Sequence, residues 1–405
     1  MKNDPLDGEL WSALRKPSMA LPLHPDALLS AMLATADSVS DCLFVVGRPP
    51  QVEVYGRLRA VDVPELGVLE PAHIQAIAEH VVGENARLWE QLRETGSCDT
   101  SYALLNVARF RVNVFRQNGA LAAVMRRLPT QIPSLDGLHL PPVLKQVVKE
   151  KTGLVFVTGA TGNGKTTTLA AMLNELNMTE DLHVVTLEDP IEFLHGHRRS
   201  TFSQRELGKD FPDFASGLRA AMRQAPKVIL VGEIRDRETM EIALTAAETG
   251  HVVYATLHTI SAALSVNRIL GFFLRDEEEQ IRQRLADVLR YIVSQRLVPR
   301  VNGGRHLVTE VMGSSLRTRE AIELGESEVR NLHEIIEANS PAGWHSFEQS
   351  LLAAFKAGKV TEETAMLYCI DKNTMRRELD AAKKTLFPPE DSGTGLRLDP
   401  LGLRS

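Results

Sequence analysis

A glycine-rich loop between an apolar strand and an amphipathic helix constrains the fold of this chain more than any other feature. Residues 159–166 read Gly-Ala-Thr-Gly-Asn-Gly-Lys-Thr and match the pattern G-x-x-x-x-G-K-[ST] throughout. The apolar run at 154–158 precedes the loop, and Leu169, Met172, Leu173 and Leu176 follow it at helical spacing. This context predicts a phosphate-binding loop in an α/β domain.

The residue types in the loop predict how it binds ATP. Glycines let successive N–H groups point at phosphate oxygens, and the start of the helix adds partial positive charge. We expect Lys165 to reach the outer phosphates and the hydroxyl of Thr166 to ligate Mg²⁺. A Gly-rich turn matching by chance is the alternative, and the flanking strand and helix argue against it. The predicted ATP-binding set is Gly159, Ala160, Thr161, Gly162, Asn163, Gly164, Lys165, Thr166 and Thr167.

Apolar strands alternate with helical segments along the second half of the chain. Strands are expected at 154–158, 184–187, 228–231 and 252–256, and their continuous apolar character is typical of a buried, mostly parallel sheet. From about 311 helices dominate, including 347–356 and 361–368.

The region before the loop has a mixed α and β pattern. Helices are expected at 27–36 and 71–92, and strands at 42–46, 52–56 and 110–115, with a hairpin partner at 121–128 after Asn118-Gly119. The predicted organisation is an extension at 1–22, an α+β domain at 23–128, a linker at 129–142, an ATPase core at 143–310, a helical region at 311–386 and a tail of disordered composition at 387–405.

Composition excludes several classes of protein. The 46 basic and 52 acidic residues leave a net charge of −6, which argues against nucleic-acid binding. The acidic start does not resemble a signal peptide, and no apolar run of about 18 residues predicts a membrane helix. The cysteines Cys42, Cys98 and Cys369 form no CxxC pair, so we expect reduced, buried thiols in a cytoplasmic protein.

Carboxylates at the ends of two predicted strands supply the chemistry of hydrolysis. Cleavage of ATP requires a metal and a residue that activates water, and both belong at the carboxyl ends of neighbouring strands. Glu233 follows the strand at 228–231 and is assigned as the base that activates water. The aspartate that usually ends a Walker-B strand is absent, and Gly232 lies in its place. Glu188 is assigned to help hold Mg²⁺ or position the attacking water. The roles of Asp189 and Glu192 remain open, and Glu192 is explained equally well as a solvated surface acid.

Two histidines flank the strand at 252–256. His258 follows the strand, at the predicted catalytic edge, and could sense the γ-phosphate. His251 precedes it, at the opposite end, and ranks lower. For an isolated histidine a structural role is the favoured interpretation.

Together these motifs resemble those of the secretion-superfamily ATPases, the hexameric motors of type IV pili and type II secretion. The loop at Gly159, the acidic box at 188–192, the segment at 232–236 and the two histidines occur in the same order and spacing. The resemblance runs from about residue 25 to 382 and implies a RecA-like P-loop NTPase core after a PAS-like N-terminal domain. The chain is most similar to twitching-motility retraction ATPases of the PilT and PilU type, because it lacks the four-cysteine zinc insertion of assembly and secretion members.

The resemblance also implies further site residues and partners. Arg111 and Arg126 match arginines that reach the nucleotide of a neighbouring site, and Arg219 and Arg223, four apart on a helix, match a pair near the pocket; a surface arginine is the alternative for each. The implied assembly is a homohexamer that turns an inner-membrane platform protein to retract a type IV pilus. The implied ring is peripheral at the cytoplasmic face of the inner membrane, without direct insertion, and a paralogous pilus ATPase is a further candidate partner.

One departure keeps alternatives open. Retraction ATPases carry an Ala-Ile-Arg-Asn-Leu-Ile signature, whereas the corresponding stretch here reads Leu-Arg-Thr-Arg-Glu-Ala-Ile at 316–322. An accessory PilU-like role is therefore an alternative, as are another type II or IV secretion ATPase and a weakly hydrolysing nucleotide-binding adaptor. A DNA-translocating ATPase is disfavoured by the acidic balance.

Overall fold

The computed structural model describes residues 21–64 and 66–386. The chain divides into two compact units. One takes in the chain up to Leu138 together with Lys151–Gly153 and Thr166–Ala255, and the other takes in His139–Glu150, Leu154–Lys165 and the chain from Thr256 onward. Within the described ranges no helix is both long and apolar enough to cross a membrane. The predicted extension and tail lie largely outside these ranges, and the domain boundaries given above stay predictions.

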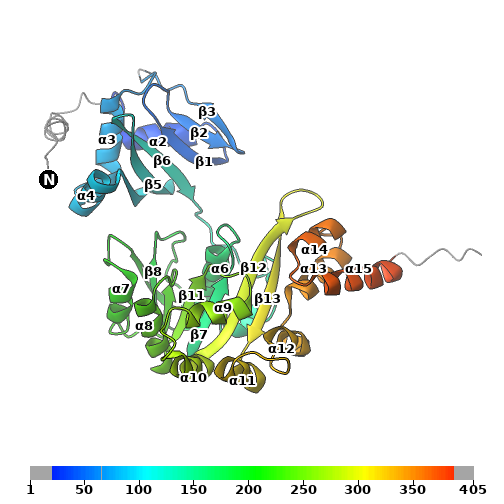
Figure 1. Cartoon of the computed structure of the whole chain (residues 1–405). Helices are drawn as coiled ribbons and strands as arrows, with labels where there is room; N and C mark the ends of the chain where they lie inside the picture. The colour runs from blue at the N-terminus through cyan, green and yellow to red at the C-terminus, as the bar shows by residue number, and fades with distance from the viewer. Residues whose placement is uncertain (1–20, 65, 387–405) are drawn as a thin grey trace, which may run out of the picture. The chain divides into compact units, whose positions relative to one another are not determined.

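The first unit begins with an antiparallel sheet in the strand order β3-β2-β1-β6-β5-β4 (Figure 1). Helices α2, α3 and α4 share one hydrophobic core with this sheet, which confirms the expected α+β composition. The elements are α2 (Pro25–Leu33), β1 (Val39–Phe44), β2 (Gln51–Val54), β3 (Arg57–Ala60), α3 (Pro71–Val82), α4 (Ala86–Thr95), β4 (Ser97–Leu104), β5 (Ala108–Gln117) and β6 (Ala120–Leu128).

The helix expected at 71–92 is wrong in one respect, because it is two helices. Gly83 ends α3 with φ of 62°, a left-handed value that favours glycine. Asn85 then caps α4 by accepting a hydrogen bond from the N–H of Leu88. The apolar periodicity of the sequence continues from α3 into α4, so the pattern alone does not reveal the break between the two helices.

The hairpin expected at Asn118-Gly119 is confirmed. Both residues have positive φ, 48° and 77°, as a two-residue turn between antiparallel strands requires. Gln117 pairs with Ala120 across it. Along β5 the alternation puts Phe110 and its even-numbered neighbours in the core, so the odd-numbered residues share the other face.

The larger sheet has the order β13-β12-β7-β11-β10-β8-β9. β10 pairs in parallel with β8 and β11, β8 pairs in parallel with β9, and β7 pairs in parallel with β12, which confirms the predicted parallel α/β core. Its elements are α5 (Leu144–Val147), β7 (Gly153–Thr158), α6 (Lys165–Thr179), β8 (His183–Glu188), β9 (Thr201–Glu206), α7 (Phe214–Ala221), β10 (Val228–Val231), α8 (Arg237–Glu248), β11 (Val252–Leu257), α9 (Ala262–Leu270), α10 (Glu278–Val288), β12 (Leu289–Pro299) and β13 (Arg305–Gly313).

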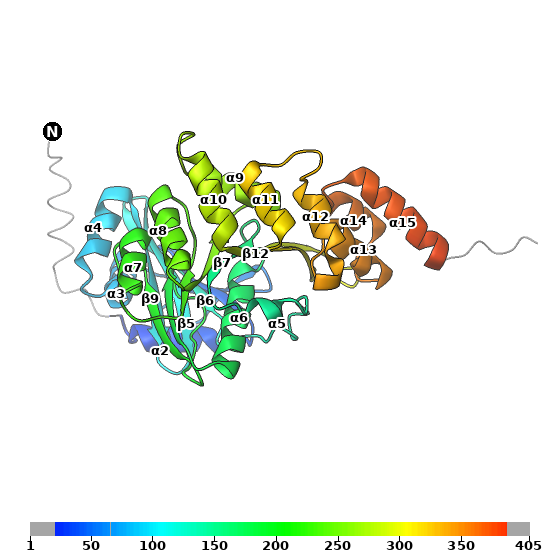
Figure 2. The same ribbon diagram turned by 90° about the horizontal axis from the view of Figure 1, so that it is seen from below.

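Strands β9, β12 and β13 have no counterpart in the sequence-based prediction. β9 reads Thr-Phe-Ser-Gln-Arg-Glu, with too few apolar residues to signal a buried strand. β12 carries Ser294 and Gln295 in buried positions, which breaks its apolar run. Helices α7 and α8 pack against each other, and α7 also packs next to β8 and β10 (Figures 1 and 2).

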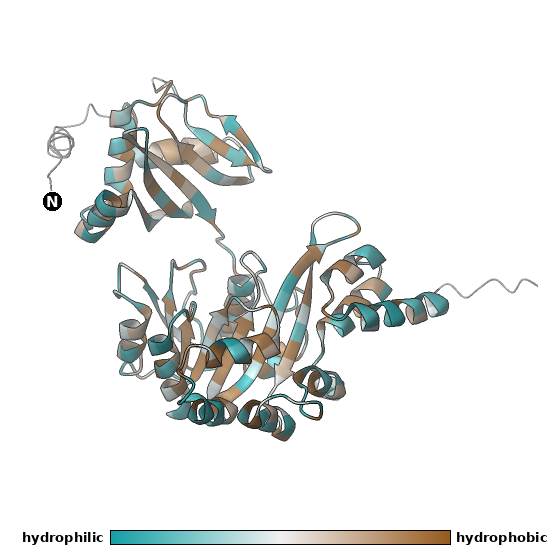
Figure 3. Ribbon diagram, viewed as in Figure 1, coloured by the Kyte–Doolittle hydropathy of each residue, from teal (hydrophilic) through white to brown (hydrophobic). Residues whose placement is uncertain are grey.

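The last part of the chain that the structure describes, residues 316–386, is mainly helical, as expected. It contains α11 (Leu316–Leu324), α12 (Leu332–Ala338), the 3₁₀ turn η1 (Ser340–Ala342), α13 (Phe347–Lys356), α14 (Glu362–Tyr368) and α15 (Lys372–Leu386). Phe347, Leu351 and Met375 form a core with Val298 of β12 and Val308 of β13, so the last helices pack on this hairpin. Hydrophobic residues gather in the strands of the sheets, whereas hydrophilic residues dominate α15 (Figure 3).

The three cysteines are free and buried, as expected. Burial raises the pKa of the Cys42 thiol to about 12, so it stays protonated at neutral pH.

Candidate functional site

The glycine-rich loop follows β7, a strand in which every residue is buried. Gly159 has φ of 144° and a Cβ built on it would lie 2.5 Å from the carbonyl oxygen of Gln295, so only glycine fits there. Ala160, Thr161 and Gly162 are exposed, which leaves this part of the loop accessible to a ligand. Helix α6 begins directly after the loop, at Lys165.

Lys165 is held inside the curl of the loop. Its side chain is buried, and Nζ donates hydrogen bonds to the carbonyl oxygens of Gly159 at 2.8 Å and Ala160 at 3.2 Å. Thr166, next in α6, is exposed, and Thr167 is half-buried. A buried cation beside exposed backbone and an exposed hydroxyl forms a site for a phosphate anion.

Strand β12 anchors the loop from the side. Asn163 Nδ2 donates to the carbonyl oxygen of Gln295 at 3.1 Å, and Asn163 Oδ1 accepts from the N–H of Leu297 at 3.3 Å. Arg305 Nη1 donates to the carbonyl oxygen of Gly162 at 3.3 Å. The contacts of Asn163 come from β12 and the contact of Arg305 comes from β13, two strands that sequence reasoning missed.

His258 lies beside the start of the loop. The N–H of Gly159 donates to the carbonyl oxygen of Leu257 at 3.3 Å, and the exposed His258 follows that residue directly. His251 precedes β11 instead, and its Nδ1 is 2.9 Å from the carbonyl oxygen of Ala246. His251 therefore has structural contacts at the opposite end of the strand, as predicted.

The predicted acids gather at the carboxyl ends of β8 and β10. The N–H of Gly232 donates to the carbonyl oxygen of Leu187 at 2.8 Å, and a Cβ on Gly232 would lie 3.1 Å from that same oxygen. A residue with a side chain would have a tight contact with this oxygen. This contact accounts for glycine at the position where a Walker-B strand usually carries aspartate. Glu233, next in the chain, is mostly buried and forms an ion pair with Arg235.

Glu188, the last residue of β8, is buried and held in one orientation. Its Oε1 accepts hydrogen bonds from Thr186 Oγ1 at 2.6 Å and Gln204 Nε2 at 3.1 Å. Burial raises the pKa of the Glu188 carboxyl, and these hydrogen bonds offset only part of the effect.

Asp189 lies among charges of both signs. Burial raises the pKa of its carboxyl, and the negative charge of Glu233 acts in the same direction. Arg111 and Arg235 act in the opposite direction. The positive charge of Arg111 therefore acts on Asp189, just after the end of β8. Glu192 is half-buried in the loop that follows.

Arg109 is a residue of this region that sequence reasoning missed. Burial lowers the pKa of its guanidinium, and the charges of Glu206 and Glu188 counteract this. Its Nη1 is buried without a hydrogen-bond partner. Arg109 and Arg111 are two apart on β5 and share a face. The resemblance pointed to Arg111, and strand alternation from Arg111 could have found Arg109.

Glu206, the last residue of β9, connects the N-terminal sheet to the segment after β8. Its carboxylate accepts from Ser101 Oγ at 2.8 and 3.0 Å and from the N–H of Ile191 at 3.2 Å. Lys209 Nζ lies 2.8 Å from Glu206 Oε1 and donates to the carbonyl oxygen of Ser101 at 2.9 Å. No motif signalled this buried acid, because its partner is 105 residues away.

Arg126 is the cross-strand neighbour of Arg111. Its Nε donates to Asp41 Oδ1 at 2.9 Å, while most of the Arg126 side chain remains exposed. Two adjacent arginines on an exposed sheet face can bind an anion such as phosphate.

The interpretation of Arg219 and Arg223 as a pair on one helix face is wrong. Helix α7 ends at Ala221, so Arg223 lies beyond it. Arg223 Nη1 donates to the carbonyl oxygen of Arg219 at 3.1 Å, and Arg219 pairs with Glu238 at the start of α8. Both side chains are exposed.

Comparison with known proteins identifies relatives across this region. The model of the family described as Type II/IV secretion system protein matches residues 106–340. The type IV pilus retraction ATPase PilT of Pseudomonas aeruginosa is 38% identical over 327 residues, 80% of this chain and 93% of that protein. The type IV pilus ATPase PilU of the same organism is 37% identical over 338 residues, 83% of this chain and 87% of that protein.

A solved structure of the pilus retraction motor PilT with bound ADP superimposes with a TM-score of 0.79. It is 37% identical in sequence and covers 88% of this chain and 99% of its own. The similarity extends over both the N-terminal sheet and the glycine-rich loop region, which supports nucleotide binding here.

Proposed function

The chain belongs to the Type II/IV secretion system protein family, and from this premise we propose that it is the ATPase that drives retraction of a type IV pilus. It is 38% identical to PilT over most of both chains, and ATP hydrolysis is the activity that the names of such relatives state. The observation that carries the proposal is the intact glycine-rich loop, with Lys165 held within it beside exposed backbone.

Each residue of the site has a proposed task. The backbone of residues 160–164 and Nζ of Lys165 bind the phosphates of ATP, and Lys165 must exchange its carbonyl contacts for phosphate oxygens. Glu233 accepts the proton of the attacking water, since it ends a buried strand beside Glu188 and Asp189. His258 follows the strand end bonded to Gly159 and contacts the γ-phosphate.

The oxygen ligands offered here suit Mg²⁺. Thr166 and Glu188 would hold the ion, whose charge offsets that of the phosphates. Glu188 is oriented by hydrogen bonds from Thr186 and Gln204. Because burial raises its pKa, an adjacent cation would favour its ionised form.

Six copies form the working ring in this proposal. Arg111 and Arg126 reach the nucleotide of a neighbouring copy, while Arg219 and Arg223 serve the pocket of their own. With ATP bound, the two domains would close about the linker at 129–142, and after hydrolysis they would open again. These would be the two states that a motor needs. The ring acts on an inner-membrane platform protein at the cytoplasmic face of the membrane.

The catalytic assignment is tested with two substitutions. Glu233→Gln should retain ATP binding and lower turnover by at least about 100-fold, a common cost of losing a catalytic acid–base group. Lys165→Ala should weaken ATP binding itself. Both are measured by phosphate release and by binding of a fluorescent ATP analogue.

Arg235→Ala is the matched control, because Glu233→Gln also breaks the ion pair with Arg235. If Arg235→Ala and Glu233→Gln lose the same activity, the ion pair and not the base explains the effect. Normal turnover in Glu233→Gln would refute the assignment outright.

An accessory role beside a second pilus ATPase is the other candidate. The identity to PilU is within one percentage point of that to PilT, and residues 316–322 depart from the retraction signature. Deletion of this gene alone separates the two: loss of fibre retraction supports the principal motor, and retention supports the accessory role. Negligible turnover by a well-formed ring would instead support a nucleotide-binding adaptor.

A further inference from the structure

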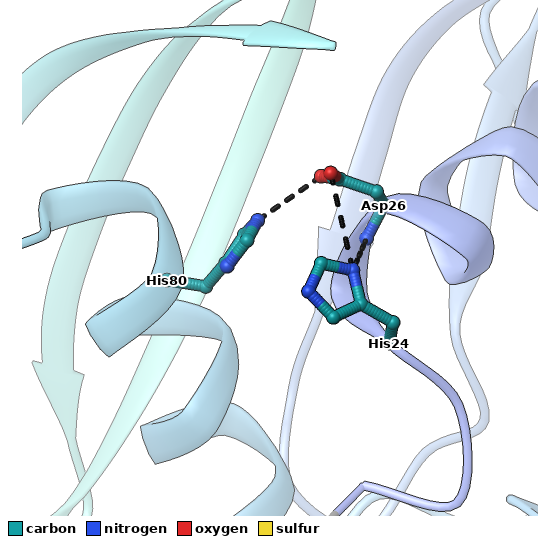
Figure 4. A group of neighbouring side chains, drawn as sticks. All are labelled: His24, Asp26 and His80. Atoms are coloured by element: carbon teal, nitrogen blue, oxygen red, sulfur yellow. Dashed lines mark hydrogen bonds and ion pairs between the residues drawn. The ribbon is translucent and has the colours of Figure 1, made fainter.

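Two histidines and an aspartate converge on one point of the N-terminal sheet domain, away from the motifs discussed above. His24 and Asp26 lie at the start of α2, and His80 lies in the last turn of α3. Figure 4 shows both imidazole rings beside the Asp26 carboxylate. One ligand atom from each residue lies within 4.8 Å of the other two.

We propose that His24, Asp26 and His80 form a binding site for a divalent transition-metal ion, Zn²⁺ in the first instance. Two imidazole nitrogens and one carboxylate oxygen are a ligand set that Zn²⁺ accepts, with a further position for water. Mg²⁺ and Ca²⁺ prefer oxygen ligands alone. This inference does not depend on the proposed ATPase function.

The distances between the ligand atoms suit this ion after small side-chain rotations. His80 Nε2 lies 3.0 Å from Asp26 Oδ1, and His24 Nδ1 lies 3.9 Å from Asp26 Oδ2. Ligand atoms of a tetrahedral zinc ion are roughly 3.3 Å apart, given Zn–N and Zn–O distances near 2.0–2.1 Å. The two ring centroids are 4.9 Å apart in an edge-to-face arrangement, so the rings already lie close to each other.

Tyr102 of β4 contacts two of the three proposed ligands and helps to orient them. Its hydroxyl donates a hydrogen bond to Asp26 Oδ1 and lies 2.7 Å from His80 Nε2. Tyr102 therefore acts as a hydroxyl donor to the carboxylate and is not one of the three proposed ligands. Such outer partners fix the orientation of metal-binding carboxylates.

Helix capping alone explains His24 poorly. Its Nδ1 accepts from the N–H of Asp26 at 3.3 Å, a task that Ser, Asn or Asp performs better at this position. Its side chain is also 63% exposed, so packing does not require an imidazole. A metal would instead join α2 to α3, whose ligands are 54 residues apart.

The test is a Zn²⁺ titration of the purified full chain, stripped of metals and free of nucleotide. Binding is followed by competition with a chromophoric chelator, and Co²⁺ replaces Zn²⁺ to report its coordination in the visible spectrum. We expect one strong site per chain, and a Zn²⁺-dependent rise in Tm. Removing an outer partner typically costs roughly 10–100-fold in metal affinity, so Tyr102→Phe should weaken binding about tenfold, and His24→Ala or His80→Ala by at least about 100-fold.

His73→Ala is the matched control, because it removes another imidazole from α3 and should leave Zn²⁺ affinity unchanged. Because His24 is largely exposed, His24→Ala keeps the fold, which circular dichroism without metal verifies. Equal Zn²⁺ affinity in the wild type and the His24→Ala, His80→Ala double variant overturns the proposal. So does a Co²⁺ spectrum that is the same in both proteins.

Discussion

Single residues at the ends of β8 and β10 set the geometry of the candidate catalytic acids. Gly232 brings the end of β10 within hydrogen-bond distance of Leu187, and Glu233 follows it next to the charges around Asp189. Glu188 keeps one orientation through Thr186 and Gln204. Small changes at these positions should therefore affect catalysis more than folding.

Gly232→Ala tests the close approach of the two strands. The new methyl group would lie 3.1 Å from the backbone oxygen of Leu187, and overpacking of this kind costs about 1–3 kcal/mol of stability. Because Glu233 moves with its neighbour, turnover should fall roughly tenfold or more, while ATP binding changes little. Gly196→Ala is the control, since a Cβ there meets nothing within 4 Å. Equal turnover in both variants would show that the spacing does not matter.

Glu188→Gln should separate stability from activity. The folded protein raises the pKa of Glu188, so the ionised carboxyl destabilises the fold, and stability is lost as pH rises through the folded pKa. The variant should therefore have a higher Tm than the wild type at pH 7, and the difference should shrink as pH falls toward the ordinary value of 4.5. Phosphate release should drop at the same time. A lower Tm of the variant at pH 7 contradicts this expectation.

At the scale of elements, β12 holds the glycine-rich loop. The strand meets the loop through Asn163, Gln295 and Leu297, and it also packs under Phe347 of α13, whose ring lies 4.0 Å from the guanidinium carbon of Arg296. One strand thus contacts both the nucleotide loop and the C-terminal helices. This gives the helical end a physical connection to the loop.

Asn163→Ala tests this anchor. It removes two hydrogen bonds, each worth about 0.5–1.5 kcal/mol, so the loop should be less ordered and the Kd for the ATP analogue should rise by up to roughly 5–150-fold. Thr161→Ala is the control, because its side chain is exposed in the same loop. Isothermal titration with a non-hydrolysable ATP analogue measures both variants. An unchanged affinity in Asn163→Ala would mean that β12 does not organise the loop.

At the scale of the whole molecule, the proposed motor depends on contacts between copies. The exposed arginines Arg111 and Arg126 lie opposite each other on β5 and β6. A purely local role explains Arg126 in part, through its ion pair with Asp41. Arg111 also has a local role, since its charge acts on Asp189 of the same chain, so action within one copy and action on a neighbouring nucleotide are alternative roles.

Mixing two inactive variants distinguishes action within a copy from action between copies. Arg111→Ala retains Glu233, and Glu233→Gln retains Arg111. If Arg111 serves the neighbouring site, mixed rings contain interfaces with both residues intact, and ATP turnover should partly recover. Each variant mixed with itself is the control. Should mixed rings remain as inactive as the separate variants, despite proven subunit exchange, Arg111 does not act between copies.

The sequence alone determined the chemistry that resides in short segments. Gly159 to Thr166, the apolar strands and the Asn118-Gly119 turn are recognisable because their side chains and backbone preferences act within a few residues. Glu233 also stands out, because Gly232 alone separates it from four buried β-formers, and its role as the base stays a prediction. Where a local signal was ambiguous, as at Gly83, the prediction merged two helices into one.

Only the tertiary structure decided which distant groups meet. Gln295 anchors a loop 132 residues away, Arg109 lies near Glu188 and Glu206, and His80 approaches Asp26 across 54 residues. Such pairs depend on strand order, register and helix packing, which no short stretch of sequence encodes. Buried polar residues in β9 and β12 are stable because their partners arrive from elsewhere in the fold, and this is why their strands had no recognisable local pattern.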